Sequence, residues 1–290
     1  MEIKVMKIED VEIISKFISQ LNNKEKSHIG YCGKDSKEIA NSLLNDLSDI
    51  KYTDSFVGAY EQNQLIGLLG FDACLENNSA EIWGPFIHED KWDVVHALWR
   101  KMSNLLPSDI RSLSMFPNIK NHNARNFAKY HSFSKQSKQT ILTFHQEDKN
   151  ELADIEMIEL SKRDIPAMKK LHNEVFPHTY FNGDQIVHRI NSNRKVFILT
   201  NQNDLSGYIY VEAEPKFGEG SIEFFAVRES ERGKGIGGKL LTVALKWLFT
   251  FEKINSITLC VNSSNDKAIS LYKKIGFKHV HDLCFLTKEL

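Results

Sequence analysis

A glycine-rich stretch with three basic side chains is the clearest place in this sequence where chemistry could occur. It runs from Arg232 to Lys239 and reads Arg-Gly-Lys-Gly-Ile-Gly-Gly-Lys. Glycines let the backbone approach a ligand closely, so that several N–H groups can point at one anion. The arginine and the two lysines add positive charge. This combination favours the binding of a phosphate group.

The segments on either side of this stretch determine where it lies. Residues 222–227 are rich in β-formers and predict a buried strand, and apolar residues then recur at helical spacing from Ile236 to Leu248. The loop therefore precedes a helix N-terminus, whose dipole also favours an anion. The stretch matches neither the P-loop pattern nor the dinucleotide motif G-x-G-x-x-G. On the loop alone, a flexible turn before a helix stays an alternative.

The length and charge of the chain limit what it can be. Its 290 residues suit two domains, and a hydrophobic content of 41% is enough to build their cores. A net charge of −1 argues against nucleic-acid or anionic-membrane binding. Charges interrupt the first ten positions, and apolar runs are shorter than a membrane span. We expect a cytoplasmic protein.

The cysteines and histidines do not predict a metal site. The cysteines are scattered without a CxxC pair, so we expect reduced thiols in the core. His279 and His281 read as strand alternation rather than as a ligand pair. The G-x-S-x-G pattern of a Ser-His-Asp hydrolase is absent. The four cysteines are Cys32, Cys74, Cys260 and Cys284.

Three short stretches of the first half recur in the second half in the same order, which predicts a duplication. The first pair reads as a strand followed by an aspartate at a helix N-cap, and the second as a hairpin turn. The third lies near the end of each half. The matched pairs are residues 2–11 with 156–165, 62–67 with 202–207, and 118–124 with 262–268.

The boundary between the halves is predicted in the polar stretch 146–151, which gives domains 1–148 and 149–290. The offset between the halves grows from 140 residues at the second match to 144 at the third. The extra residues fall on the glycine-rich stretch, where the first half has residues 91–95 without glycine. The halves are predicted to share a fold, with the loop in the second half alone.

Two motifs of the second half resemble the GNAT superfamily of acyl-CoA-dependent N-acyltransferases. Residues 232–237 are similar to its acyl-CoA signature, [Arg/Gln]-x-x-Gly-x-[Gly/Ala], and residues 262–277 to its later motif, Asn-x-x-Ala-x-x-Leu-Tyr followed by Gly-Phe. The resemblance covers residues 155–290 and reaches 1–145 only through the repeat. It implies an α/β fold of the α+β type, with two tandem GNAT-like domains. Each would have a mixed, mostly antiparallel sheet flanked by helices.

The resemblance also implies acetyl-CoA as co-substrate. In this family the loop wraps the coenzyme pyrophosphate, and the preceding strand splays from its neighbour, often at a β-bulge, to bind the pantetheine arm. The Val227 N–H would polarise the thioester carbonyl, unless Val227 is only a core residue. Asn265 would contact the coenzyme or serve as a helix N-cap. The implied binding residues are Val227, Arg232, Gly233, Lys234, Gly235, Ile236, Gly237, Gly238, Lys239 and Asn265.

Two residues are implied to be catalytic. Tyr272 matches the tyrosine near the thioester sulfur, where a phenol protonates the departing thiolate. Its alternative role is packing. Glu223 is the best candidate to assist deprotonation of the acceptor amine, and strand alternation places it on the same face as Val227. Its alternative role is binding a cationic substrate. Glu212 and Glu214 are weaker candidates.

The first half lacks these groups. The repeat places Ala128 where the second half has Tyr272, and Trp83 where it has Glu223. We expect no coenzyme binding and no catalysis in the first half, which instead would pack on the second and shape the acceptor cleft. Four aromatic residues would serve that contact or, for at least two of them, the domain's own core. They are Trp83, Phe86, Trp92 and Trp99.

We therefore expect an N-acetyltransferase in which a primary amine attacks the thioester directly. The acceptor, a small molecule or a peptide, is not specified by the sequence, and no metal, nucleic acid or membrane partner is expected. An oligomer is not indicated. The alternative is an acyl-CoA-binding sensor or regulatory module without turnover.

Overall fold

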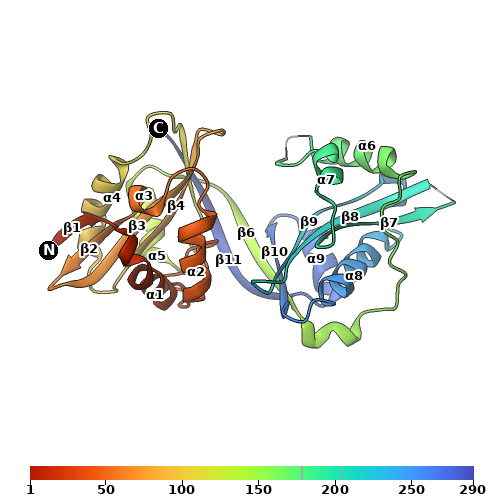
Figure 1. Cartoon of the computed structure of the whole chain (residues 1–290), viewed down its shortest axis with the longest axis horizontal. Helices are drawn as coiled ribbons and strands as arrows, with labels where there is room; N and C mark the ends of the chain where they lie inside the picture. Colours follow the sequence, from red (N-terminus) through yellow and green to blue (C-terminus); the bar gives the residue numbers. More distant parts are fainter. Residues whose placement is uncertain (178, 203) are drawn as a thin grey trace. The chain divides into compact units, whose positions relative to one another are not determined.

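The computed structural model describes residues 1–177, 179–202 and 204–290, which form two compact units (Figure 1). Unit 1 comprises Met1–Gln139 and His281–Leu290, and unit 2 comprises Thr140–Val280. These units differ from the predicted domains 1–148 and 149–290. The reason is that two long strands, β6 (Ser134–His145) and β11 (Lys278–Glu289), each begin in one unit and end in the other.

Unit 1 is a seven-stranded sheet with helices packed on it. The strand order is β1-β2-β3-β4-β5-β11-β6, with β4 and β5 parallel and the assigned neighbours β1–β2, β2–β3, β3–β4 and β5–β11 antiparallel. The other elements are β1 (Glu2–Val5), α1 (Val11–Asn22), α2 (Ser36–Asn41), α3 (Tyr52–Ser55), β2 (Val57–Glu61), β3 (Gln64–Cys74), β4 (Ser79–Ile87), α4 (Val95–Ser103), β5 (Ser112–Met115) and α5 (His122–Tyr130).

Unit 2 contains an antiparallel three-stranded sheet in the order β7-β8-β9, and β10 lies beside β6. In Figure 1 the helices α6 and α7 lie on one side of the three-stranded sheet and α8 on the other. The elements are α6 (Ile165–Val175), α7 (Gly183–Arg189), β7 (Arg194–Asn201), β8 (Asp204–Glu214), β9 (Glu219–Val227), α8 (Ile236–Leu248), β10 (Ser256–Asn262) and α9 (Asp266–Ile275).

Each face of the three-stranded sheet carries its own apolar core. Leu240 and Leu245 of α8 pack on one face together with Ile209 of β8. Met168 of α6 packs on the other face with Phe224 of β9. A strand buried on both faces is fixed in register and twist, because a slip by one residue would exchange its two sets of side chains.

The duplication predicted from the sequence is visible in the strand registers and caps. The β2–β3 ladder shifts between Ala59 and Tyr60, and the β7–β8 ladder shifts 140 positions later, between Leu199 and Thr200. The predicted hairpin turn at Gln62–Asn63 has positive φ at both residues. Its counterpart includes Asn203, which lies outside the described residues.

The third match repeats at the level of single hydrogen bonds. The side chain of Asn121 caps α5 by accepting from the Ala124 N–H at 3.0 Å, and Asn265 caps α9 by accepting from the Ala268 N–H at 3.1 Å. Ser132 and Gly276, paired by the same offset, both end their helices with positive φ. Sequence similarity in these stretches therefore reflects conserved local geometry.

Several details differ from the sequence-based expectations. Asp10 and Asp164 are N-cap residues, but their side chains accept no capping bond from the helices. The Asp10 carboxylate instead accepts from the Lys7 N–H, and the Asp164 carboxylate accepts from the Ser161 hydroxyl. The strand expected near residues 156–160 is reduced to a bridge at Glu159. The described residues contain no disulfide bond, and Cys260 is exposed instead of lying in the core.

The four aromatic residues of the first half belong to the core of unit 1. Trp83 and Phe86 are buried there, and Trp92 and Trp99 pack against the core clusters of this unit.

Throughout the described ranges, helices long and apolar enough to cross a membrane are absent. Those ranges also lack a group of three or more His, Cys, Asp or Glu side chains placed to hold a metal ion.

Unit 1 contains one carboxyl group whose ionisation should affect stability. Burial, with a smaller contribution from Asp72, raises the pKa of Glu81 to about 7, against 4.5 for an ordinary glutamate. Between pH 4.5 and 7 the Glu81 carboxyl is therefore protonated in the folded protein and ionised in the unfolded protein. The stability that this difference gives is complete below pH 4.5 and is lost as the pH rises through 7.

We predict that Glu81→Gln, which cannot ionise, stabilises the protein at pH 8 by on the order of 2 kcal/mol and much less at pH 5. Thermal unfolding followed at both pH values measures the difference. Glu76→Gln is the matched control, because Glu76 lies exposed on the same hairpin. An equal shift for Glu81→Gln at pH 5 and pH 8 would contradict the prediction.

Candidate active site

The glycine loop joins β9 to α8 in the order that the sequence predicts. Gly233 and Gly235 both have φ of +80°, a conformation in which most side chains are strained. A Cβ atom at either position would meet nothing within 4 Å among the described residues, so it is the backbone conformation that requires glycine. Gly235 is the N-cap of α8, which then runs for 13 residues.

The loop presents a row of unpaired N–H groups. The Arg232 N–H donates to the Glu229 carbonyl, and the Lys239 N–H donates to the Gly235 carbonyl. Between them, from Gly233 to Gly238, the described part of the chain offers no hydrogen-bond acceptor to the backbone N–H groups. A row of N–H donors at a helix N-terminus is suited to bind the oxygens of a phosphate or pyrophosphate.

The basic side chains of the loop differ in their surroundings. Lys234 forms an exposed ion pair with Glu231 at 2.9 Å. The Arg232 Nε reaches the Val227 carbonyl at 3.3 Å. Lys239, in the first turn of α8, is exposed. The backbone N–H groups are therefore the fixed donors of this surface, whereas the basic side chains are exposed or engaged with other groups.

Gly237 and Gly238 serve a different purpose, because they face α9. A Cβ on Gly237 would lie 3.2 Å from the Leu271 side chain, and one on Gly238 would lie 3.3 Å from Ile275. These two glycines let α8 and α9 approach closely. That approach brings Tyr272, in the middle of α9, toward β9.

The outer edge of β9 is formed by the backbone groups of Val227 and Phe225. The Arg228 N–H donates to the Ser206 carbonyl at 2.9 Å, so these two residues are a hydrogen-bonded pair of the β8–β9 ladder. The next pair, Gly207 with Val227, is then a non-hydrogen-bonded one. The N–H and C=O groups of Val227 therefore point away from β8, and two residues earlier those of Phe225 do the same.

This edge is not paired with the next strand. β9 ends one sheet and β10 belongs to the other, and no ladder joins them in the described ranges. In unit 1 the corresponding strands, β4 and β5, do pair, from Ser79 with Ser112 to Glu81 with Ser114. Unit 2 thus has the splayed strands that the family resemblance implies.

Tyr272 lies beside this edge. Its ring contacts Phe225 edge-to-face, with centroids 6.2 Å apart, and also packs on Phe277. Burial raises the pKa of Tyr272 to about 12, so the phenol keeps its proton at neutral pH. The structure brings together Tyr272, Val227 and the glycine loop, whereas Asn265 uses its side chain to cap α9.

Glu223 lies on the opposite face of β9. The register of β8 and β9 shifts by one residue at Glu223, which forms the β-bulge. Its carboxylate accepts a hydrogen bond from the Tyr180 hydroxyl on the α6–α7 side, while Val227 packs on the α8 side. The prediction that strand alternation places Glu223 and Val227 on one face is therefore wrong, because the bulge interrupts the alternation.

The weaker candidates on β8 are engaged elsewhere. Glu212 receives three bonds from the Arg189 guanidinium, at 2.9, 3.1 and 3.1 Å, one from Arg194 at 2.9 Å, and one from the Tyr210 hydroxyl. The bonds from these partners outweigh burial and lower the pKa of Glu212. A carboxylate held in this way is a poor general base. Glu214 is paired with Arg194 at 3.4 Å.

In unit 1 the β5 side of the corresponding gap between strands is covered by the chain itself. Residues 28–30, in the linker between α1 and α2, lie antiparallel to residues 116–118, which follow β5. The Gly30 N–H donates to the Phe116 carbonyl at 2.8 Å. Since β11 occupies the opposite edge of the same segment, both edges are closed to an added ligand.

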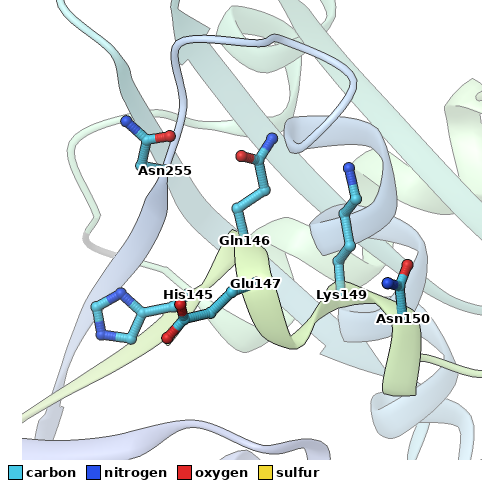
Figure 2. A pocket seen from close by; sticks show the side chains of 6 residues that line it. All are labelled: His145, Gln146, Glu147, Lys149, Asn150 and Asn255. Carbon is cyan, nitrogen blue, oxygen red and sulfur yellow. The ribbon is translucent and has the colours of Figure 1, made fainter.

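A cavity of about 440 Å³ lies elsewhere in unit 2. Figure 2 shows that its lining side chains point in different directions, with His145 turned away from Lys149. It lies by Asn255, which precedes β10. Its lining contains none of the predicted site residues, so it is not the candidate active site.

The family model of the GNAT acetyltransferases matches residues 165–277, which include β9, the glycine loop and α9. This part of the chain, residues 165–277, belongs to the GNAT acetyltransferase family. A tandem GNAT protein from the clavulanic acid biosynthesis pathway shares the fold, with a TM-score of 0.63 and 13% identity over 99% of this chain and 98% of that one. The fold of the whole chain is therefore that of a tandem GNAT protein.

Two curated GNAT relatives resemble parts of the chain. A mycothiol acetyltransferase from Corynebacterium aurimucosum is 32% identical over 28% of this chain. The chain spans only 25% of the length of that relative. An N-alpha-acetyltransferase from Sulfurisphaera tokodaii is 28% identical over 40% of this chain and 76% of that protein.

The geometry of the two units predicts one acetyl-CoA per chain, bound by unit 2. Isothermal titration of the full chain should therefore give a stoichiometry near one. Gly235→Glu should weaken binding at least about tenfold, because it strains a left-handed position and adds negative charge beside the N–H row. Lys253→Ala, at an exposed residue that follows α8 and lies outside the loop, is the control. Undiminished binding by Gly235→Glu would contradict the assignment of the loop.

Proposed function

We propose that the protein is an N-acetyltransferase that moves the acetyl group of acetyl-CoA to a primary amine. The observation that carries the proposal is the outward-pointing N–H of Val227 on an unpaired strand edge, next to the N–H row of the glycine loop. The loop would hold the pyrophosphate, and the edge of β9 the pantetheine arm.

In this proposal the chain provides a preorganised donor for the reaction. The Val227 N–H would hydrogen-bond to the thioester oxygen, on which negative charge develops as the amine attacks. The amine nitrogen forms a bond to the carbonyl carbon, and the carbon–sulfur bond then breaks. The nitrogen loses one proton and the coenzyme sulfur gains one, so the products are an amide and free coenzyme A.

Tyr272 would act on the departing sulfur. Its pKa of about 12 lies above that of an ordinary thiol, about 8.5, so complete proton transfer to a thiolate costs on the order of 5 kcal/mol. The buried phenol is therefore better suited to donate a strong hydrogen bond to the developing thiolate, with the final proton supplied from solvent.

The acceptor is a primary amine in this proposal. The name of the relative from Sulfurisphaera tokodaii, an N-alpha-acetyltransferase, supports an amine nitrogen as the nucleophile. The carboxylate of Glu223 would receive the amine, either as the base or as the counter-ion of the ammonium group. Unit 1 would not bind a second coenzyme, because it lacks the glycine loop and its own residues 28–30 pair with residues 116–118 on the β5 side of the corresponding gap.

The proposal is tested by incubating the purified full chain with acetyl-CoA and a panel of amines and peptides. Mass spectrometry then identifies any acetylated product, and Gly235→Glu serves as the inactive control. A product formed by the wild type and absent with the control supports the proposal and identifies the acceptor class. Binding of acetyl-CoA without transfer to any amine, peptide or protein substrate would instead favour a sensor.

We predict that Tyr272→Phe lowers kcat about 100-fold and changes the Kd of acetyl-CoA less than about twofold, because the variant keeps the ring that packs on Phe225 and loses only the hydroxyl. Steady-state kinetics and titration measure the two effects. Tyr130→Phe removes an exposed hydroxyl from unit 1 and is the control. Wild-type turnover by Tyr272→Phe would remove Tyr272 from the mechanism.

A further inference from the structure

The linker between α6 and α7 places a tyrosine over the bulge of β9. The Tyr180 hydroxyl donates to the Oε2 atom of Glu223 at 2.5 Å. Tyr180 lies at the surface, with 61% of the residue exposed. The position shows no periodicity and no motif in the sequence, so sequence reasoning does not find it.

Contacts from both helices and from β9 hold this part of the linker in place. The His172 Nε2 lies 2.7 Å from the Phe181 carbonyl, and the Arg189 guanidinium lies 4.2 Å above the Phe181 ring. The Tyr180 ring packs on Phe224, with centroids 4.8 Å apart. These contacts fix Phe181 and the Tyr180 ring, and they hold the Tyr180 hydroxyl beside Glu223.

The histidine of this clamp is itself fixed. His172 is fully buried, and its Nδ1 lies 2.5 Å from the Tyr208 hydroxyl. Because the Phe181 carbonyl can only accept, the Nε2 atom carries the hydrogen and the Nδ1 atom accepts from Tyr208. Burial lowers the pKa of His172, which keeps the imidazole neutral and this arrangement intact at neutral pH.

We propose that Tyr180 is a positioning residue that orients the Glu223 carboxylate toward the acceptor amine. Its hydroxyl occupies Oε2 and leaves Oε1 for an N–H of the amine. The bulge turns Glu223 toward the linker, so a carboxylate without this partner would be free to rotate away. The inference rests on the proposed acetyl transfer and adds to it that the α6–α7 linker forms one wall of the acceptor site.

The test is a double-mutant cycle on the full chain with Tyr180→Phe, Glu223→Gln and the double variant. Tyr180→Phe keeps the ring on Phe224 and removes one hydrogen bond to a charged group. It should lower kcat for the acceptor amine about tenfold. In the Glu223→Gln background the same change should have less than about a twofold effect, because the carboxylate that the hydroxyl orients has been replaced by a neutral amide.

Binding of acetyl-CoA shows that each variant is folded, and its Kd should stay within about twofold of the wild-type value. Equal effects of Tyr180→Phe in both backgrounds would show that the hydroxyl acts without Glu223 and would overturn the inference. So would unchanged kcat in the wild-type background. If the wild type itself acetylates no amine, the proposed function fails and the role of Tyr180 with it, which is a different result from either of these.

Discussion

The unpaired edge of β9 is the constraint on which the rest of unit 2 depends. A strand in the middle of a fold normally satisfies its N–H and C=O groups on both sides, because unpaired backbone groups are costly away from water. Among the described residues, the only strand that pairs with β9 is β8. The fold can keep the other edge open because α8 and α9 pack over the gap from one face, and because the edge borders the exposed glycine loop.

The two units differ in the pairing of the strands beside this edge. Both units repeat the ladder shifts, the asparagine caps and the left-handed helix ends. In unit 1, however, β4 and β5 begin as a parallel pair, and residues 28–30 continue the sheet beyond it. The linker between α1 and α2 thus satisfies backbone groups of residues 116–118, on the β5 side of the gap.

The sequence was sufficient where local chemistry determines local structure. The positive φ of Gly233 and Gly235, the start of α8 and the hairpin at Gln62–Asn63 follow from residue type and spacing. The course of β6 and β11 through both units does not, because strand pairing between residues far apart leaves no local signal. The bulge at Glu223 also could not be predicted from the sequence. One inserted residue moves the side chains that precede it to the other face of the sheet, without changing the β-forming composition of the strand.

This reversal changes how the two catalytic candidates relate to each other. Had Glu223 and Val227 shared a face, the carboxylate would have lain on the α8 side with Tyr272. With the bulge, Tyr272 lies on the α8 side and Glu223 on the side of the α6–α7 linker. A thioester at the β9 edge would then have its leaving group near a phenol and its attacking amine near a carboxylate, on opposite faces of one strand. Such a separation suits direct transfer, because the phenol that binds the leaving sulfur and the carboxylate that receives the amine then approach the thioester from different sides.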